Sequence, residues 1–306
     1  MGMKISTYYY QCIEKNFEDE MIAKEIEKYI ELIPESGYRP TTVFLNRSML
    51  INHKKVNRIM REFNLLCRKK RKFKTKTTDS DHGLKKYSNI AKDIETTDIN
   101  QVIVGDVTAY DVKGKDHFLA SLIDRHNRRV IGKAVSDKNN TELLLAALGD
   151  AMRTRGNVEG CIHHTDSDVR YCSNDYINRL NFYKMKISMC VGNAYENAHA
   201  ESFNGTIKRQ EINISDYDDK DESARSIFNF IDKYNSIRPH SSLQNLTPIE
   251  YENMLIKTKR KHKVVYSFKG AAHFSILHCS FNNLSASLKL GSPLISGFNP
   301  CSVIRQ

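Results

Sequence analysis

The sequence predicts an α/β domain with a mixed five-stranded sheet, preceded by a small helical domain. Three apolar segments joined by short turns lie between about 101 and 135, and helix-like and strand-like segments then alternate up to 189. Apolar residues at helical spacing within the first 66 residues predict the helical domain. We therefore divide the chain into an N-terminal lead at 1–18, a helical domain at 19–67, a basic linker at 68–98, an α/β core at 99–257 and a poorly ordered tail at 258–306.

The helical domain contains two periodic segments separated by GYRP at 37–40. The first carries isoleucines at helical spacing, namely Ile22, Ile26, Ile30 and Ile33. In the second, which follows Asn52, one face is apolar and another presents Lys54, Arg58 and Arg61. A short helix, a turn and an amphipathic helix with a basic face form the arrangement with which helix-turn-helix proteins read a major groove. A solvated charged face on an ordinary small bundle is the alternative.

The charge of the chain favours a polyanionic partner. Lysine and arginine outnumber aspartate and glutamate by 47 to 36, and residues 1–76 alone hold 17 basic and 9 acidic residues. The segment RKKRKFKTK at 68–76 contains seven basic residues in nine, and we expect its first five to contact DNA phosphates: Arg68, Lys69, Lys70, Arg71 and Lys72. The alternative is a solubilising linker between two domains.

The core begins with three segments typical of an antiparallel meander: QVIVGDVTAY (101–110), HFLASLID (117–124) and RRVIGKAV (128–135). A helix capped by Asn140 or Thr141 and ended by Gly156 follows. CIHHTD, SNDYINRLNFY and KMKISM then predict a strand, a helix and a strand. Two further helices are expected at about 195–211 and 221–237, the second ended by Pro239.

Cysteine use and hydropathy exclude several classes of protein. The seven cysteines are odd in number and include no C-x-x-C pair, which argues against a disulfide framework and a structural zinc site. No apolar stretch approaches the roughly 20 residues of a membrane helix, and MGMKISTYYY lacks the apolar segment of a signal peptide. We expect a cytoplasmic protein without a membrane partner.

Three acidic residues are candidates for chemistry. Asp106 lies inside an apolar strand, where a carboxylate costs several kcal/mol unless it is compensated. Asp166 follows the CIHHTD strand, and ligands of open α/β sheets are held at strand ends. Glu201 lies in a predicted helix, and Lys208, seven positions later, projects from the same helical face. Taken singly, each acid has an ordinary explanation as an ion-paired aspartate or a surface Glu–Lys pair.

Three converging carboxylates would need a cation between them. Two carboxylates 4 Å apart repel by about 4 kcal/mol at an effective dielectric of 20. Hard oxygen ligands select Mg²⁺ or Mn²⁺, and a pair of such ions can activate an attacking oxygen and stabilise the leaving oxygen of a phosphodiester. The three acids therefore predict phosphoryl transfer on nucleic acid.

Four blocks in order, VGDVTAY, IHHTD, NAYENAHAESFNGTIK and YNSIRPHSSLQNLTPIEY, resemble the transposases of the IS-three family of bacterial insertion sequences. GYRPTTVFLNRSMLINHKKVNRIMREFNL resembles the helix-turn-helix segment of that family, so the resemblance runs from about 20 to 255. It implies a ribonuclease-H-like fold and an Asp, Asp, Glu catalytic triad. By position the triad falls on Asp106, Asp166 and Glu201, with 34 residues between the last two, and the basic residue after the Glu falls on Lys208.

The resemblance implies a metal-dependent transposase that cuts element ends and joins them to target DNA. Expected partners are element-end and target DNA, further copies of the chain on that DNA, and a protein made from an upstream reading frame. The expected location is the bacterial cytoplasm, in association with the nucleoid. Two alternatives stay open: a catalytically inactive DNA-binding remnant or regulator of transposition, and a structure-specific nuclease on the same fold.

Two positions depart from the pattern of the family. Asp168 stands where the family has Gly, which predicts a different turn and an electrostatic effect on the metal site. Glu196 stands where the family usually has Asp, but it lies some 140° around a helix from Glu201 and is a poor triad candidate.

Other polar residues near the triad have structural explanations. His163 and His164 point to opposite faces of a strand, so they cannot readily hold one metal ion together. We expect His163 to pack in the core and His164 to share the face of Asp166. We expect Asp111, Asp124 and Asp216 to be surface or turn residues.

Overall fold

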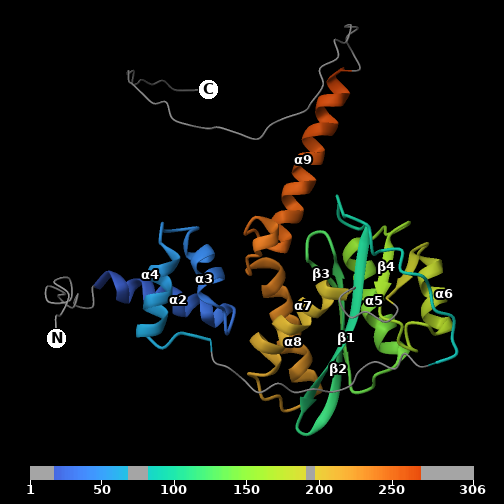
Figure 1. Ribbon diagram of the computed structural model, residues 1–306, viewed down its shortest axis with the longest axis horizontal. Coiled ribbons are helices and arrows are strands. Elements are labelled where there is room, and N and C mark those ends of the chain that lie inside the picture. Colours follow the sequence, from blue (N-terminus) through green and yellow to red (C-terminus); the bar gives the residue numbers. More distant parts are fainter. Residues whose placement is uncertain (1–16, 68–81, 191–196, 270–306) are drawn as a thin grey trace, which may run out of the picture. The chain divides into compact units, whose positions relative to one another are not determined.

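The computed structural model describes residues 17–67, 82–190 and 197–269 (Figure 1). The chain divides into two compact units, Met1–Lys261, which contains the helical domain and the core, and His262–Gln306. Among the described residues, no helix is long and apolar enough to cross a membrane. Within the described ranges, no disulfide joins Cys67, Cys161, Cys172 and Cys190 to one another.

The helical domain contains three helices, α2 (Phe17–Leu32), α3 (Tyr38–Leu45) and α4 (His53–Glu62). Ile26, Val56 and Ile59 are among the buried residues of its apolar core. The GYRP segment that interrupts the isoleucine pattern is where α3 begins. Its proline lies in the first helical turn, where backbone N–H groups have no partner within the helix, so the missing N–H costs no hydrogen bond. Asn52 caps α4, and its side chain accepts a hydrogen bond of 2.8 Å from the Lys54 N–H.

The core is built on a five-stranded mixed sheet with the strand order β3-β2-β1-β4-β5. Its strands are β1 (Val102–Val112), β2 (Lys115–Asp124), β3 (Val130–Ser136), β4 (Ile162–Thr165) and β5 (Lys186–Met189). β1, β2 and β3 pair antiparallel, and β4 pairs parallel with both β1 and β5. The predicted antiparallel meander followed by two further strands is confirmed.

Helices cover both faces of this sheet (Figure 1). α5 (Thr141–Arg155) and α6 (Asn174–Phe182) bury their apolar sides against one face. α7 (Ala198–Ile207) and α8 (Lys220–Ser236) bury theirs against the other. Side chains alternate along a strand, so Val104, Asp106 and Tyr110 of β1 share the α7 face, while Ile103 and Val107 face α5.

Local signals placed the ends of several helices correctly. The Asn140 side chain accepts a hydrogen bond from the Leu143 N–H and begins α5, and Gly156 ends that helix at a φ of 69°. The predicted helix at 195–211 is α7 followed by a π-helical turn, η2 (Lys208–Ile212).

The C-terminal boundary differs from the expected one. After a short 3₁₀ turn, η3 (Ser241–Leu243), helix α9 runs from Pro248 to Lys269 and passes the predicted end of the core at 257. The beginning of the predicted tail is therefore helical. Residues 270–306, and the basic stretch 68–76, lie outside the described residues.

A buried ion network joins β2, α5 and α9. Arg155 pairs with Asp124 at 3.2 Å and with Glu252 at 2.6 Å, and Arg129 pairs with Glu252 at 2.8 Å. Asp124 is fully buried, so the prediction that it is a surface or turn residue was wrong. Its partners come from distant parts of the chain and leave no local signal in the sequence.

Candidate active site

The parallel pairing of β1 and β4 brings the two aspartates together. Val102 pairs with Ile162 and Val104 with His164, and the same register, continued past the end of β4, sets Asp166 beside Asp106. Neighbouring strands lie about 4.8 Å apart, and both residues belong to the set of alternate positions that faces α7. The main chain therefore juxtaposes two carboxylates that are far apart in the sequence.

Helix α7 crosses the same face and is attached to β1 by two asparagine side chains. Asn204 donates a hydrogen bond of 2.7 Å from Nδ2 to Oδ2 of Asp106. Asn197, the N-cap residue of α7, donates one of 3.1 Å to the Gly105 carbonyl. Glu201 lies between them on α7 and is exposed. The two amides fix the position of the helix that carries Glu201 against the strand that carries Asp106.

The carboxylates influence one another electrostatically. The pKa of Asp106 is raised to about 7, first by burial and next by the negative charge of Asp166. Hydrogen bonds from the Val107 N–H and from Asn204 oppose this rise, and the charge of Glu201 adds a smaller upward contribution. Asp106 is therefore a carboxyl group whose ionised form lacks a compensating cation.

Lys208 is the basic group nearest in sequence to this cluster. It is half-buried at the start of the π-helical turn; burial lowers its pKa, and the negative charge of Asp106 opposes that change. No ion pair joins Lys208 to an acid among the described residues. Its ammonium group remains able to bind an anion near the carboxylates.

The donor set suits a divalent cation. Carboxylate oxygens are the ligands that Mg²⁺ and Mn²⁺ prefer, and a cation would relieve the repulsion that raises the pKa of Asp106. Within the described ranges, however, no three His, Cys, Asp or Glu side chains are gathered closely enough to form a ready metal site. The repulsion between the carboxylates gives a physical reason for a spread arrangement.

The two histidines of β4 are both buried and serve the packing of the sheet. Nε2 of His163 lies 2.8 Å from the hydroxyl of Tyr176 on α6, and burial lowers the pKa of His163 to about 3. Nδ1 of His164, on the other face, lies 2.9 Å from the Ser188 hydroxyl on β5. His163 is thus a core residue, as its position in the strand predicted.

Asp168 does not continue the strand, because β4 ends at Thr165. It is 1% exposed and forms an ion pair of 2.5 Å with Nε of Arg170, whose backbone N–H also donates to it. The Asp168 N–H donates in turn to Oδ1 of Asp166 at 3.3 Å. The acid that replaces the expected glycine thus belongs to a turn that includes its own cation.

The remaining predicted site residues fall into three groups. Lys54 and Arg61 of α4 are exposed. Arg58 pairs with Asp19 at 3.0 Å and with Glu62 at 2.9 Å, so part of its guanidinium already has acidic partners. The others lie outside the described residues: Arg68, Lys69, Lys70, Arg71, Lys72 and Glu196.

Sequence reasoning assigned no role to Asn197 or Asn204. Asn197 lies four residues before Glu201 and Asn204 three residues after it. This helical spacing places both asparagines on the face of Glu201 and is the feature of the sequence that could have indicated their role. Their acceptors on β1 are nearly a hundred positions away, so the contacts themselves could not be anticipated.

The strand order, the strand-end carboxylates and the attached helix define an integrase-type core of ribonuclease-H-like fold that follows a helix-turn-helix-like domain. Two family descriptions named "Integrase core domain" match residues 97–193 and 184–248, and an "HTH-like domain" matches 17–73. The 31-kDa protein of insertion element IS600 from Shigella sonnei is 30% identical over 260 residues, which are 82% of this chain and 95% of that protein. The transposase InsF of insertion sequence IS3A from Escherichia coli K12 is 32% identical over 205 residues, 66% of this chain and 71% of its own length.

The chain belongs to the IS-three family of insertion-sequence transposases. Among solved structures, the catalytic core domain of HTLV-2 integrase in complex with magnesium aligns with a TM-score of 0.43 and 17% identity, over 52% of this chain and 99% of that one. The matching family descriptions and insertion-sequence relatives confirm the expected family, and the strand order confirms the expected class of fold. The protein acts in transposition, and its domains imply DNA as partner and phosphoryl transfer as chemistry.

Proposed function

We propose that Asp106, Asp166 and Glu201 bind a pair of Mg²⁺ or Mn²⁺ ions and that this site both cuts and joins DNA strands. The observation that carries the proposal is the parallel β1–β4 register, which sets Asp166 beside Asp106. The raised pKa of Asp106 agrees with it, because a divalent cation would stabilise two neighbouring carboxylates. When bound, the cations would activate the attacking oxygen and stabilise the leaving oxygen of a phosphodiester.

Two phosphoryl transfers follow from one site. In the first, a water oxygen forms a bond to phosphorus while the bond from phosphorus to the 3′-oxygen breaks, which leaves a 3′-hydroxyl and a 5′-phosphate. In the second, that 3′-hydroxyl loses its proton and attacks a target phosphodiester, and a target 3′-oxygen leaves. Both steps concentrate negative charge at the phosphate, which positioned cations stabilise.

The surrounding residues orient the acids and the DNA. Asn204 donates to Oδ2 of Asp106 and the Val107 N–H donates to Oδ1, so the two contacts together fix the orientation of the carboxylate. Lys208 provides a cation for the DNA backbone beside the cluster. Exposed Lys54 and Arg61, together with the basic segment Arg68, Lys69, Lys70, Arg71 and Lys72, would hold the element end, while Arg58 divides its charge with acids of its own domain.

The test compares charge-neutral variants on a duplex that carries the inverted repeats flanking the gene. Glu201→Gln is expected to lose metal-dependent cleavage and strand joining by at least about a thousandfold while it still binds the duplex in Ca²⁺. Asp175→Asn, an exposed acid of α6 on the opposite face, is the matched control and should retain full activity. Undiminished activity of Glu201→Gln would remove the proposed site.

The same assay separates the alternatives. An inactive remnant would show no cleavage in the wild type, and a plain nuclease would give hydrolysed ends without joined product. Asp168 and the unusual tail motivated the idea of a remnant. The pairing of Asp168 with Arg170 removes the first of these reasons, because it gives the extra carboxylate a partner within its own turn. Further copies of the chain and an upstream-frame protein remain proposed partners.

A further inference from the structure

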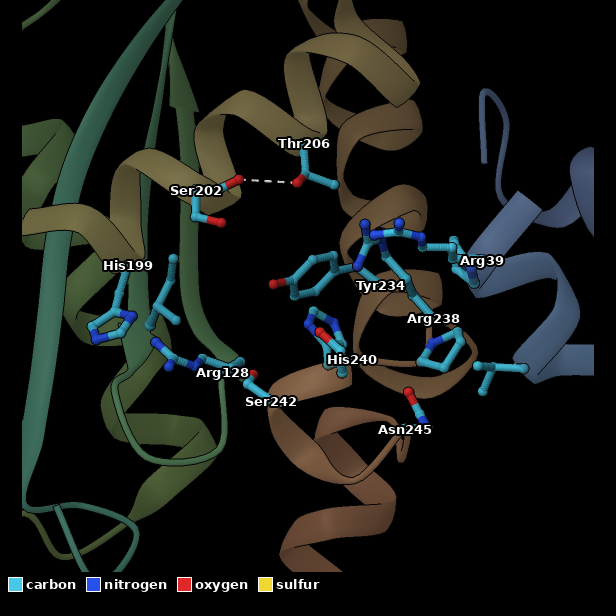
Figure 2. A pocket seen from close by; sticks show the side chains of 15 residues that line it. Arg39, Arg128, His199, Ser202, Thr206, Tyr234, Arg238, His240, Ser242 and Asn245 are labelled. Atoms are coloured by element: carbon cyan, nitrogen blue, oxygen red, sulfur yellow. Dashed lines mark hydrogen bonds between the residues drawn. The ribbon is translucent and has the colours of Figure 1, made fainter. Parts of the chain in front are cut away.

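A pocket on the α8 side of α7 is lined by residues that the proposed chemistry does not use (Figure 2). Tyr234, Arg238 and His240 come from the YNSIRPH segment at the end of α8, and Arg128 comes from the turn between β2 and β3. Ser202 and Thr206 line it from α7. Figure 2 shows the Tyr234 hydroxyl pointing into the open space between Ser202, His199 and Arg128.

The pocket is basic and contains no acid. No aspartate or glutamate occurs among its lining residues, and neither Arg128 nor Arg238 forms an ion pair within the described parts of the chain. Arg238 stacks over the Tyr234 ring at 5.7 Å and donates from Nε to Gln210 at 3.3 Å, which leaves its terminal nitrogens available. A partly buried cation without an acid is costly, so the charges favour an anionic ligand.

Arg128 is held in an unusual backbone conformation. Its φ is 61°, in the left-handed region that a residue with a Cβ rarely adopts. Burial lowers its pKa, and its charge acts on both Tyr234 and His240. The β2–β3 turn imposes this conformation, because the Arg128 N–H donates to the Asp124 carbonyl at 2.9 Å.

Neutral donors complete the pocket. Burial and the two arginines lower the pKa of His240 to about 3, so its ring is neutral at physiological pH. The ring packs edge-on against Tyr234 with centroids 4.8 Å apart, and its buried Nε2 has no hydrogen-bond partner within the described ranges. Two guanidinium groups, a phenol and a neutral imidazole are donors suited to the oxygens of a phosphate.

The role that we infer for the pocket rests on the function proposed above for the neighbouring acids. Ser202 directly follows Glu201, and consecutive helical residues point about 100° apart. The carboxylates and the pocket therefore flank the same helix, separated by roughly one helix diameter of 10 Å. At about 3.4 Å per nucleotide, a DNA strand would cross that distance in about three nucleotides.

We propose that Arg128, Arg238 and Tyr234 bind a backbone phosphate of the DNA strand that crosses α7, about three nucleotides from the bond that is cleaved. The contact carries no sequence information and fixes the register of the strand on the catalytic helix. The bound phosphate belongs to a strand of DNA and is not a free phosphate ion.

The test measures the salt dependence of DNA binding by the full chain, in Ca²⁺, between about 50 and 200 mM salt. Loss of one phosphate contact makes the negative slope of log K against log salt shallower by about 0.9. At about 0.1 M salt this corresponds to a roughly eightfold loss of affinity for DNA. Arg128→Asn, which tolerates the left-handed backbone, and Arg238→Gln should each show this change. Arg238→Lys keeps the charge and should restore most of the slope.

Arg153→Gln is the matched control, because Arg153 is an exposed arginine of α5 on the opposite face of the sheet, and its slope should equal that of the wild type. Unfolding temperatures verify that each variant is folded. An unchanged slope in folded Arg128→Asn and Arg238→Gln overturns the proposal. Stabilisation of the wild type by inorganic phosphate alone, with an unchanged DNA slope in the variants, also overturns it, in favour of a free-phosphate site. Because Glu201→Gln reports on cleavage independently, failure here leaves the proposed chemistry standing.

Discussion

Asp106, which is partly buried, and Asp124, which is fully buried, lie on neighbouring strands of one sheet, but their surroundings differ. Asp124, at the end of β2, has the guanidinium of Arg155 at 3.2 Å and accepts backbone hydrogen bonds from Asn100 and His126. Asp106, in the middle of β1, has a second carboxylate as its strongest charged neighbour. Burial raises the pKa of both. The charge of Asp124 is compensated by an ion pair within the fold, whereas Asp106 forms no ion pair with a basic side chain among the described residues and is therefore suited to a metal cation.

Exchange of the two carboxylates for amides tests this contrast most strongly. Asp106→Asn is expected to lose at least about a thousandfold in strand cleavage while it stays folded, because a metal ligand is removed. Asp124→Asn should retain its activity per folded molecule and lose stability instead, because Arg155 keeps a buried charge without its partner. Initial cleavage rates, normalised to the folded fraction from circular dichroism, distinguish the two outcomes. Equal activity loss in both variants would contradict the division of roles.

Removal of the shared cation of the ion network is the next largest effect. Arg155 is 4% exposed at its side chain and bridges Asp124 to Glu252, so Arg155→Met leaves two buried carboxylates less compensated. We expect a loss of about 3–5 kcal/mol in the free energy of unfolding, measured with denaturant. Arg153→Gln, two residues away and exposed, should change it by less than about 0.5 kcal/mol. A small effect at Arg155 would mean that the network is not needed for stability.

The pH dependence of stability sharpens the comparison further. A carboxyl whose pKa is raised to about 7 in the fold keeps a proton that the unfolded chain, with an ordinary value of 3.8, has already released. Stability is therefore highest below about pH 4 with respect to this group and is lost as the pH rises through 7. Metal-free Asp106→Asn lacks this loss and should be more stable than the wild type by about 4 kcal/mol at pH 8.

A divalent cation should act in the opposite direction. Mg²⁺ is expected to raise the unfolding temperature of the wild type at pH 8 and leave that of Asp106→Asn nearly unchanged, because a ligand stabilises only the state that binds it. Thermal unfolding with and without Mg²⁺ measures both effects. If metal-free Asp106→Asn is no more stable than the metal-free wild type at pH 8, the Asp106 carboxylate already has a cationic partner.

The smallest expected effect concerns the Asp168–Arg170 pair, which stands beside Asp166 and yet is internally compensated. Arg170→Leu alone removes the cation from a buried carboxylate. In the double variant with Asp168→Gly, the carboxylate is gone as well, so the losses should not add, with a coupling of about 1–2 kcal/mol. Strictly additive losses in a denaturant titration would show that the pair does not act as a unit.

The sequence was informative where structure depends on neighbouring residues. Alternation of side chains located β1 to β3, and Asn140 and Gly156 marked both ends of α5, because strand alternation and helix caps are local properties. The proposed triad was placed by the order and spacing of motifs, and the β1–β4 register agrees with the proximity of Asp106 to Asp166.

What the sequence missed depends on partners that are far apart along the chain. The burial of Asp124 requires Arg155 and Glu252, and the basic pocket requires Arg128 and Arg238 to meet across the core. The extent of α9 was also missed, since nothing in the composition near residue 258 marks a continuing helix. Such features follow from tertiary packing, which periodicity does not encode.

The β1–β2 connection has a practical consequence for engineering. Lys113 and Gly114 form a two-residue hairpin loop with positive φ at both positions, 49° and 79°, and both are exposed. Because backbone pairing of β1 with β4 sets Asp106 beside Asp166, the length of chain between these strands does not determine their separation. New termini opened at Gly114, as in a circular permutant, or a fluorescent label inserted there, should leave the carboxylates in register.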